Sequence, residues 1–201
     1  MLSPVLLLLG ASALSTALPS PPGTAVSPDG YTFVDEKMVT RHVTLSDGTT
    51  GLISENPHFK LVRDDTALVK RLTWRPGGDN NKCGASSING RTSGGSPSVD
   101  DCAWIRDFMG NDANSGHYEA SWPGDLHTNG DWTRLQIHGS CVFGIKTRNS
   151  NGAYVGSTDI RDLIRDAINQ AQADGRIGAE GNMGCDTNGQ QSSVDWAIFH
   201  S

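Results

Sequence analysis

Four cysteines constrain the fold of this chain more than any other feature. All of them lie downstream of residue 82, and they are Cys83, Cys102, Cys141 and Cys185. Free buried thiols are one alternative, and a zinc site is another. Zinc is disfavoured because no two of the cysteines, and no histidine pair, have the short spacing of zinc ligands. An even number of cysteines behind an apolar leader instead predicts two disulfide bonds in an exported domain.

The pairing of the cysteines stays open at this level, because four cysteines allow three connectivities. We favour Cys102–Cys141, with Cys83–Cys185 outside it. The first bond would pin an early helix to a central strand, and the second would tie together the loop-rich ends of the domain. In the chain-entropy model, each bond would stabilise the domain by about 4–5 kcal/mol.

Residues 1–17 have the pattern of a secretory signal peptide. Their apolar run, from Val5 to Ala11, matches the core of such a peptide and is too short to cross a bilayer. Small residues end the segment, so we expect cleavage after Ala17. No later stretch approaches the roughly 18 apolar residues of a membrane span. The sequence therefore predicts a secreted, extracellular protein.

A cysteine-free segment, residues 18–71, separates the leader from the rest of the chain. Residues 18–30 are rich in Pro, Ser and Gly, which predicts disorder. Residues 31–69 contain short alternating pieces, typical of either a weak hairpin or a removable pro-segment. The dibasic pair Lys70-Arg71 suits a kexin-like processing protease, which would leave residues 72–201 as the mature domain. Dibasic pairs also occur by chance, so an uncleaved chain is the alternative.

Two amphipathic helices are predicted in this domain. Residues 98–101 resemble a capping box, with Asp101 in place of the usual Glu, and would open a helix of about 12 residues that Gly110 stops. The second helix begins at Ser157 and ends near residues 174–175. Its large aliphatic side chains share one face, and they are Ile160, Leu163, Ile164 and Ile168. Burial of this face makes the second helix part of the core.

The remaining regular segments predict strands. Residues 135–146 indicate a strand that is kinked at Gly139. Residues 149–152 form a hairpin-type turn into the next strand. Two closing strands are expected at residues 176–179 and 194–199. This element order favours an α+β fold, in which a small antiparallel sheet carries both helices on one side.

Composition excludes several functional classes. The chain has 16 Lys and Arg against 22 Asp and Glu, a mildly acidic balance that gives no general attraction to nucleic acids or anionic membranes. No Asn-x-Ser/Thr acceptor for N-glycosylation occurs. The length that remains after the leader suits one domain. We therefore expect a monomer that binds no nucleic acid and needs no cofactor or metal.

Candidate catalytic residues are sparse. His117, Glu119 and His138 could assemble a ribonuclease-type acid–base site, although nothing in their spacing requires it. Asp101 is better explained by the helix cap. The segment 139–144 is not a nucleophile elbow, because its second glycine is displaced. We therefore predict a protein that is not an enzyme, with a secreted hydrolase such as a ribonuclease as the alternative.

The tryptophans offer a different interpretation. Trp104 and Trp196 fit core packing, and the simplest role for the other aromatic residues is to anchor loops. The alternative is an exposed surface that binds a host protein or glycan. It would lie in the loop after the first helix and would contain Tyr118, Trp122 and Trp132.

Several short motifs, taken in order, resemble one family. They are Cys83-Gly84-x-Ser86, Ser93-Gly94-Gly95-Ser96-Pro97-x-Val99-x-Asp101-Cys102, Gly139-Ser140-Cys141-Val142-Phe143, Asp159-Ile160-x-Asp162-Leu163-Ile164, Gly178-Ala179-x-Gly181-x-Met183-x-Cys185 and Val194-x-Trp196. The set resembles the fungal extracellular-protein-two effectors, also called the necrosis-inducing factor domain. The resemblance covers about residues 83–200 and includes all four cysteines, whereas residues 18–75 lie outside it.

This resemblance implies a small secreted effector of a plant-associated fungus that acts in the host apoplast. It would promote virulence or trigger cell death by binding a host or competitor protein or a membrane component. The family offers no established catalytic residues to carry over. A weaker similarity, in the Gly-Ser-Cys strand and the aliphatic helix, is to killer protein four-like toxins, which are α/β sandwiches that affect calcium channels. A killer-type antifungal toxin is therefore a further alternative.

Overall fold

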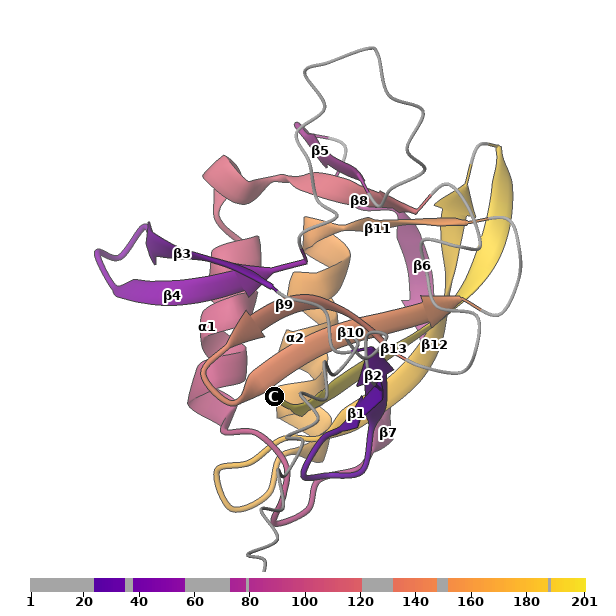
Figure 1. Cartoon of the computed structure of the whole chain (residues 1–201). Coiled ribbons are helices and arrows are strands. Elements are labelled where there is room, and N and C mark those ends of the chain that lie inside the picture. The colour runs from indigo at the N-terminus through magenta and orange to yellow at the C-terminus, as the bar shows by residue number, and fades with distance from the viewer. Residues whose placement is uncertain are drawn as a thin grey trace, which may run out of the picture.

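The computed structural model describes residues 24–34, 38–56, 73–78, 80–120, 132–147, 152–187 and 189–201 (Figure 1). The predicted signal-peptide cut after Ala17 and the dibasic pair Lys70-Arg71 lie outside these ranges and stay predictions. Within them, no helix is long and apolar enough to cross a membrane.

An eight-stranded antiparallel sheet forms the centre of the molecule. Its strand order is β3-β4-β9-β10-β13-β12-β6, and β7 also pairs with β12. The strands are β3 (Val39–Thr44), β4 (Thr50–Glu55), β6 (Cys83–Ser86), β7 (Asn89–Gly90), β9 (Thr133–His138), β10 (Cys141–Thr147), β12 (Ala179–Thr187) and β13 (Gln190–His200). The central strands β10 and β13 are buried along most of their length, because both faces of the sheet are covered.

Two smaller sheets complete the strands. The three-stranded sheet has the order β11-β8-β5, and the remaining pair is the hairpin β1–β2. Their bounds are β1 (Thr24–Val26), β2 (Thr32–Val34), β5 (Thr73–Pro76), β8 (Gly116–Ala120) and β11 (Ala153–Gly156).

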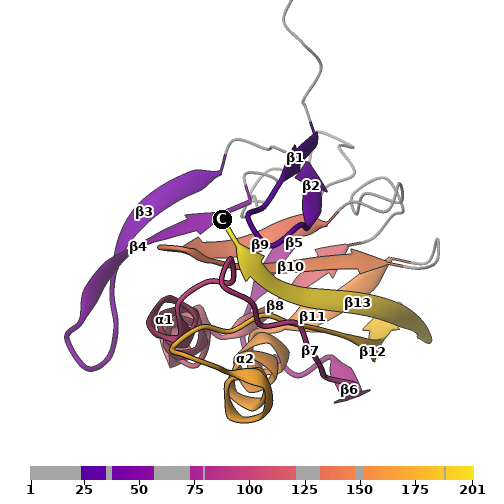
Figure 2. The same cartoon turned by 90° about the horizontal axis from the view of Figure 1, so that it is seen from below.

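Both helices lie on the same face of the central sheet (Figure 2). They are α1 (Val99–Met109) and α2 (Ser157–Ala171), and a short 3-10 turn, η1 (Asp112–Asn114), follows α1. Their apolar sides meet the sheet, where Phe108, Ile160 and Ile164 are at most 1 % exposed. Each fully buried side chain of this size contributes about 1.5–3 kcal/mol. The predicted α+β class, with two helices on one side of an antiparallel sheet, is therefore confirmed.

The opposite face carries a smaller apolar cluster of Trp132, Val142, Ala197 and Phe199. It exists because side chains alternate along β10 and β13, so that Val142 faces away from the helices while its neighbour Phe143 faces them. Tyr31, in the turn of the β1–β2 hairpin, packs against this cluster. Figure 2 shows this hairpin on the side away from the helices.

Two disulfides staple the domain. Cys102–Cys141 joins α1 to β10, with sequence separation 39. Cys83–Cys185 joins β6 to β12, with sequence separation 102. These are the pairs that we favoured from the sequence.

The segment expected to be one kinked strand is instead a hairpin. β9 and β10 are antiparallel neighbours in which His138 pairs with Cys141, so Gly139 and Ser140 form a two-residue turn. Gly139 has a φ of 52°, which suits glycine at the first position of such a turn. The interpretation as a single strand failed because a tight turn within an apolar run looks like a kink.

Other strands also differ from expectation. The loop expected after the first helix contains β8. The segment Ala153–Gly156 pairs with β8. The hairpin-type turn expected at residues 149–152 lies, except for residue 152, outside the described residues. Residues 24–34 form a hairpin, although disorder was predicted for residues 18–30. β4 joins the central sheet beside β9, so the sheet is larger than the small one that we expected.

Candidate functional site

The exposed aromatic surface that was the alternative role of these residues is not formed by the two members that the structure describes. Tyr118 is 3 % exposed and Trp132 is 6 % exposed, so the expectation is wrong for both residues. Tyr118 points inward from β8, where its ring lies 4.6 Å from that of Trp74. Trp132 lies beneath Tyr31. The third member, Trp122, lies outside the described residues.

The three residues of the alternative hydrolase site are not brought together. His117 and Glu119 lie on β8 of the three-stranded sheet, with 3.2 Å between Nε2 and Oε1. His138 lies at the end of β9 in the central sheet, where its ring stacks on Trp104 at 4.0 Å and its Nδ1 contacts the Leu52 carbonyl at 2.6 Å. Each histidine therefore has a structural environment of its own, in which His117 contacts Glu119 and His138 contacts Trp104 and Leu52.

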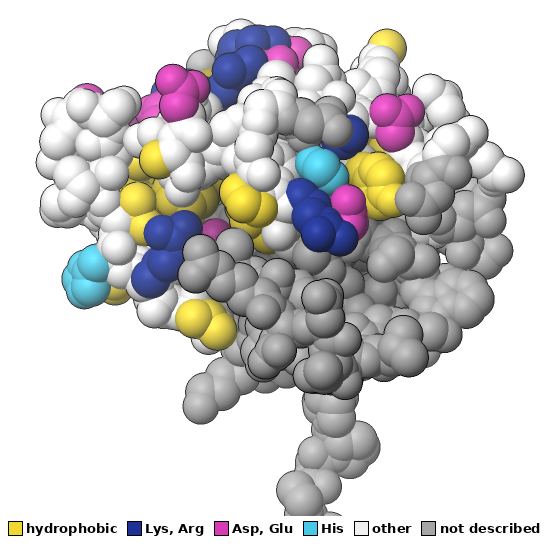
Figure 3. Space-filling view, turned by 90° about the horizontal axis from the view of Figure 1, so that it is seen from above, with side chains coloured by type: hydrophobic (Ala, Val, Ile, Leu, Met, Phe, Trp, Pro, Cys, Tyr) yellow, Lys and Arg dark blue, Asp and Glu magenta, His cyan; other side chains and the backbone are white. Residues whose placement is uncertain are grey.

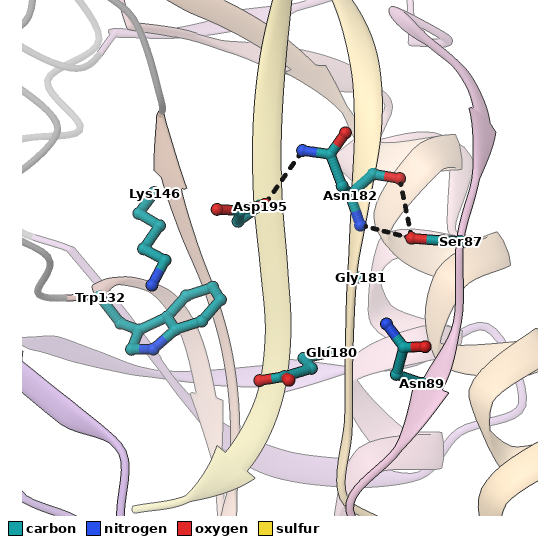
Figure 4. Close-up of a pocket in the computed structure, with 8 residues that line it drawn as sticks. All are labelled: Ser87, Asn89, Trp132, Lys146, Glu180, Gly181, Asn182 and Asp195. Atoms are coloured by element: carbon teal, nitrogen blue, oxygen red, sulfur yellow. Dashed lines mark hydrogen bonds between the residues drawn. The ribbon is translucent and has the colours of Figure 1, made fainter.

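The face of the sheet away from the helices is hollowed instead. Two adjoining hollows of about 210 and 480 Å³ share three lining residues, Trp132, Lys146 and Glu180. We call them together the sheet-face groove, and Figure 4 shows the residues that line the smaller of the two hollows. Its other polar lining residues are Asp29, Tyr31, Ser87, Asn89, Arg91, Ser93, Asn182 and Asp195.

Strand register assembles the groove. Lys146 on β10 pairs with Asp195 on β13, and Asp195 pairs with Asn182 on β12. The three side chains therefore form a row across the sheet, on the same face as Glu180. Figure 4 shows Lys146 beside the ring of Trp132, and the Asn182 amide directed toward Asp195.

Lys146 is the distinctive charge of the groove. Its Nζ lies 4.5 Å from the centroid of the Trp132 ring, a cation–π contact. Among the described residues it has no ion pair within 4.0 Å. An ammonium group held over an indole ring in this way can donate hydrogen bonds to a ligand.

Hydrogen bonds and an ion pair hold the two carboxylates of the groove, those of Glu180 and Asp195. Tyr31 Oη donates to Glu180 at 3.3 Å, and Arg91 forms an ion pair with the same carboxylate at 2.6 Å. Burial, and then the Glu180 carboxylate, raise the pKa of Tyr31, so its hydroxyl stays protonated. The side-chain amide of Asn182 donates from Nδ2 to Asp195 Oδ1 at 3.0 Å. In the intact chain these contacts hold the carboxylates of Glu180 and Asp195 in place.

Gly181 on β12 allows the segment that carries Ser87 to lie close against the sheet. A Cβ at Gly181 would lie 1.9 Å from the Ser87 carbonyl oxygen. The backbone N–H of Ser87 donates to the backbone carbonyl of Asn182 at 3.0 Å, and the backbone N–H of Asn182 donates to Ser87 Oγ at 3.0 Å. The segment that carries Ser87 and Asn89 is therefore fixed beside β12.

A second cavity, of about 520 Å³, is more apolar. Figure 3 views the side of the molecule where hydrophobic side chains gather next to Lys or Arg. The cavity is lined by Trp74, Phe108, Met109 and Tyr118, with the Arg41–Glu55 ion pair (2.7 Å) at one side. Burial, and then the nearby Glu55, raise the pKa of Tyr118, which accepts a hydrogen bond from the Gln136 amide.

Of the residues that line the sheet-face groove, Trp132 was singled out from the sequence, but the polar residues were not. Lys146 and Asp195 were noted only as members of strands, and Asn182 was not singled out. One signal could have found them: they are polar residues in strands whose other positions are apolar. No cluster of three or more His, Cys, Asp or Glu in the described ranges could hold a metal ion.

Comparison with known proteins identifies the domain. Residues 82–185, just over half of the chain, match a family described as "Pathogen effector; putative necrosis-inducing factor". The chain belongs to this family. The match contains both disulfides and most of the groove, whereas residues 24–56 lie outside it. The resemblance inferred from the motifs is thereby confirmed.

Two curated relatives come from Penicillium expansum. One, named "Probable chitinase LysM18", is 27 % identical over 128 residues, which are 59 % of this chain and 8 % of the relative. The other, named "Secreted chitinase LysM12", is 29 % identical over 120 residues, which are 54 % of this chain and 7 % of the relative. The chain thus spans less than a tenth of the length of either relative.

Proposed function

We propose that this protein is a secreted effector that acts on a plant host in the apoplast by binding a host component, and that the sheet-face groove is its binding site. Family membership carries the effector role. Lys146 lies over Trp132 and has no ion pair among the described residues, and the fixed amide and carboxylate groups around it support the choice of the groove.

Binding is favoured over catalysis by the geometry of the histidines. His117 and His138 lie on different sheets, and each is engaged by neighbouring residues. General acid–base catalysis needs both groups within hydrogen-bond reach of one substrate. The groove, in contrast, presents donors and acceptors that are already oriented, which lowers the entropic cost of binding a polar ligand.

Leaf infiltration with the purified protein tests this proposal. We expect cell death from the wild type and from a His138→Ala variant, a reduced response from Lys146→Ala, and no degradation of RNA by any of them. Lys82→Ala is the matched control, because Lys82 also lies over an aromatic ring, that of Tyr154 at 5.8 Å, but outside the groove. Loss of activity in a folded His138→Ala protein would contradict the binding mechanism and support the hydrolase.

A second candidate function is the binding of a chitin oligosaccharide. The names of the two relatives motivate it. The acetamido groups and hydroxyls of such a ligand could bond to amides and carboxylates of the groove, including Asn89 and Asp195.

Calorimetric titration with N-acetylglucosamine oligomers tests this candidate. We expect saturable binding that weakens several-fold in Asn89→Ala. Asn169→Ala, an exposed change on α2, should bind like the wild type. No heat of binding with the folded wild-type protein would refute the candidate without affecting the proposal of a host protein as ligand.

A further inference from the structure

One end of the sheet-face groove is bounded by a segment of the chain itself, the turn that carries Tyr31. The ring of Tyr31 stacks on Phe199, with centroids 5.1 Å apart and planes at 17°. The same ring meets Trp132 edge-on at 5.8 Å. Its hydroxyl donates to Glu180 at 3.3 Å. The tyrosine is thus bound as a ligand side chain would be, by two aromatic rings and one acceptor.

The turn that carries Tyr31 is preorganised. The Tyr31 amide donates to Ser27 Oγ at 2.8 Å, and the Ser27 amide donates to the Tyr31 carbonyl at 2.9 Å. A closed turn loses little conformational entropy when it docks. The segment Ser27–Tyr31 is therefore a compact unit that can bind as a whole.

Two contacts with the backbone of the domain fix the position of this turn. The Asp29 carboxylate accepts from the amide of His200, at 3.2 and 3.1 Å to its two oxygens. The Pro28 carbonyl lies so close to Gly95 that a Cβ there would be 2.8 Å from its oxygen. The domain therefore recognises an aspartate and the tyrosine two residues after it.

This turn lies outside the part of the chain that belongs to the family. The family match begins at residue 82, and all four cysteines also lie downstream of the turn. No disulfide holds the turn in place, so backbone connectivity alone keeps it at a high local concentration. A cut at the dibasic pair Lys70-Arg71 would remove that advantage.

We propose that Trp132, Phe199, Glu180 and the His200 amide form a receptor for a tyrosine-bearing turn, which the Ser27–Tyr31 turn occupies in the intact chain. The partner is a protein segment of the same chemistry: a turn with aspartate two residues before tyrosine. Binding of this partner requires displacement of the internal turn. The inference rests on the proposed binding function and names the chemistry of its partner.

Fluorescence anisotropy with a labelled peptide of residues 24–34 tests the receptor. The protein is the full secreted chain, either intact or cut by a dibasic-specific protease. We expect weak binding to the intact chain and saturable binding, at least about tenfold tighter, to the cut chain, because the tethered competitor is lost. Peptides with Tyr31→Ala or Asp29→Asn should bind the cut chain more weakly, and the tyrosine change should cost at least about tenfold.

An intact Tyr31→Ala chain covers the case in which the cut fragment stays docked. It should bind the wild-type peptide more tightly than the intact wild-type chain does. Thr40→Ala, an exposed change in β3, is the control and should behave like the wild type. If the cut chain and the Tyr31→Ala chain both remain folded by circular dichroism and neither binds the peptide, the receptor is refuted.

The leaf assay separates this inference from the proposed function. Peptide binding with no cell death at any dose would leave the receptor standing and remove the proposed host role. Cell death that depends on Lys146, without peptide binding, would keep the proposed role and remove the receptor.

Discussion

Asp101 links helix α1 to the β9–β10 turn, and its loss should destabilise the protein measurably. Its carboxylate accepts from the Ser140 amide at 2.7 Å and from Ser140 Oγ at 2.6 Å. In Asp101→Asn, each bond falls from the charged class, worth about 1.5–3 kcal/mol, to the neutral class, worth about 0.5–1.5 kcal/mol. Together the two bonds should lose about 2–3 kcal/mol, a large part of a typical stability of about 5–15 kcal/mol.

Urea denaturation, followed by circular dichroism, measures this loss. Asp100→Asn is the matched control, because Asp100 shares the first turn of α1 but is exposed. Both changes weaken the interaction with the helix dipole similarly. The difference between the two variants therefore isolates the contacts with Ser140. Equal free energies of unfolding for Asp101→Asn and Asp100→Asn would refute the reasoning.

The pH dependence gives an independent check. Burial raises the pKa of Asp101, but the hydrogen bonds from Ser140 and Ser98 and the nearby His138 outweigh it and hold the pKa below its ordinary value. An acid with a lowered folded-state pKa stabilises the fold above its unfolded pKa, about 3.9, and loses that contribution as the pH falls through the folded value. The stability difference between wild type and Asp101→Asn should therefore be full near neutrality and shrink below about pH 4. A pH-independent difference would show that charge does not contribute.

Three further changes test the scaffold. Gly139→Ala should lower the free energy of unfolding in urea by more than about 2 kcal/mol, because φ is 52° and the new Cβ would lie 2.4 Å from the Asp101 carboxyl carbon. This cost should shrink when Asp101 is also alanine, and strict additivity of the two changes would contradict the clash. Replacement of Cys102 and Cys141 by alanine should lower the free energy of unfolding by about 4 kcal/mol, and replacement of Cys83 and Cys185 by about 5 kcal/mol, since the second disulfide closes the longer loop. An unfolding midpoint that is the same with and without each bond would contradict this prediction. Ile164→Asp should abolish folding, because the side chain is 0 % exposed, and a native circular dichroism spectrum would contradict this placement in the core.

The helices were predictable because the signals were local. The apolar spacing of α2 and the Ser98 cap of α1 depend on residues within a few positions of each other. Ser98 Oγ accepts from the Asp101 amide at 3.1 Å, as the capping motif predicts. The Asp101 carboxylate departs from that motif, since it bonds to Ser140, which a long-range contact brings to the same place.

The strands were less predictable because their partners are distant in sequence. β8 carries His117, Tyr118 and Glu119 in a segment whose neighbours are rich in Gly, Asn and Asp, so it looked like a loop. Its partners β5 and β11 supply the missing backbone hydrogen bonds. The groove was missed for the same reason, because Lys146, Asp195 and Asn182 become neighbours only through the register of three strands.

Two family motifs that are far apart in sequence form one structural joint. Asp101-Cys102 and Ser140-Cys141 lie side by side, linked by the carboxylate bonds at the first position and by the disulfide at the second. Gly139 has no side chain because the Asp101 carboxylate fills that space. The Asp101 carboxylate and the two cysteines hold α1 against the sheet, and each is bonded to a partner there. The motifs that carry the resemblance to the family therefore lie in its scaffold, and the proposed ligand site uses other residues, such as Lys146 and Glu180 on the opposite face of the sheet.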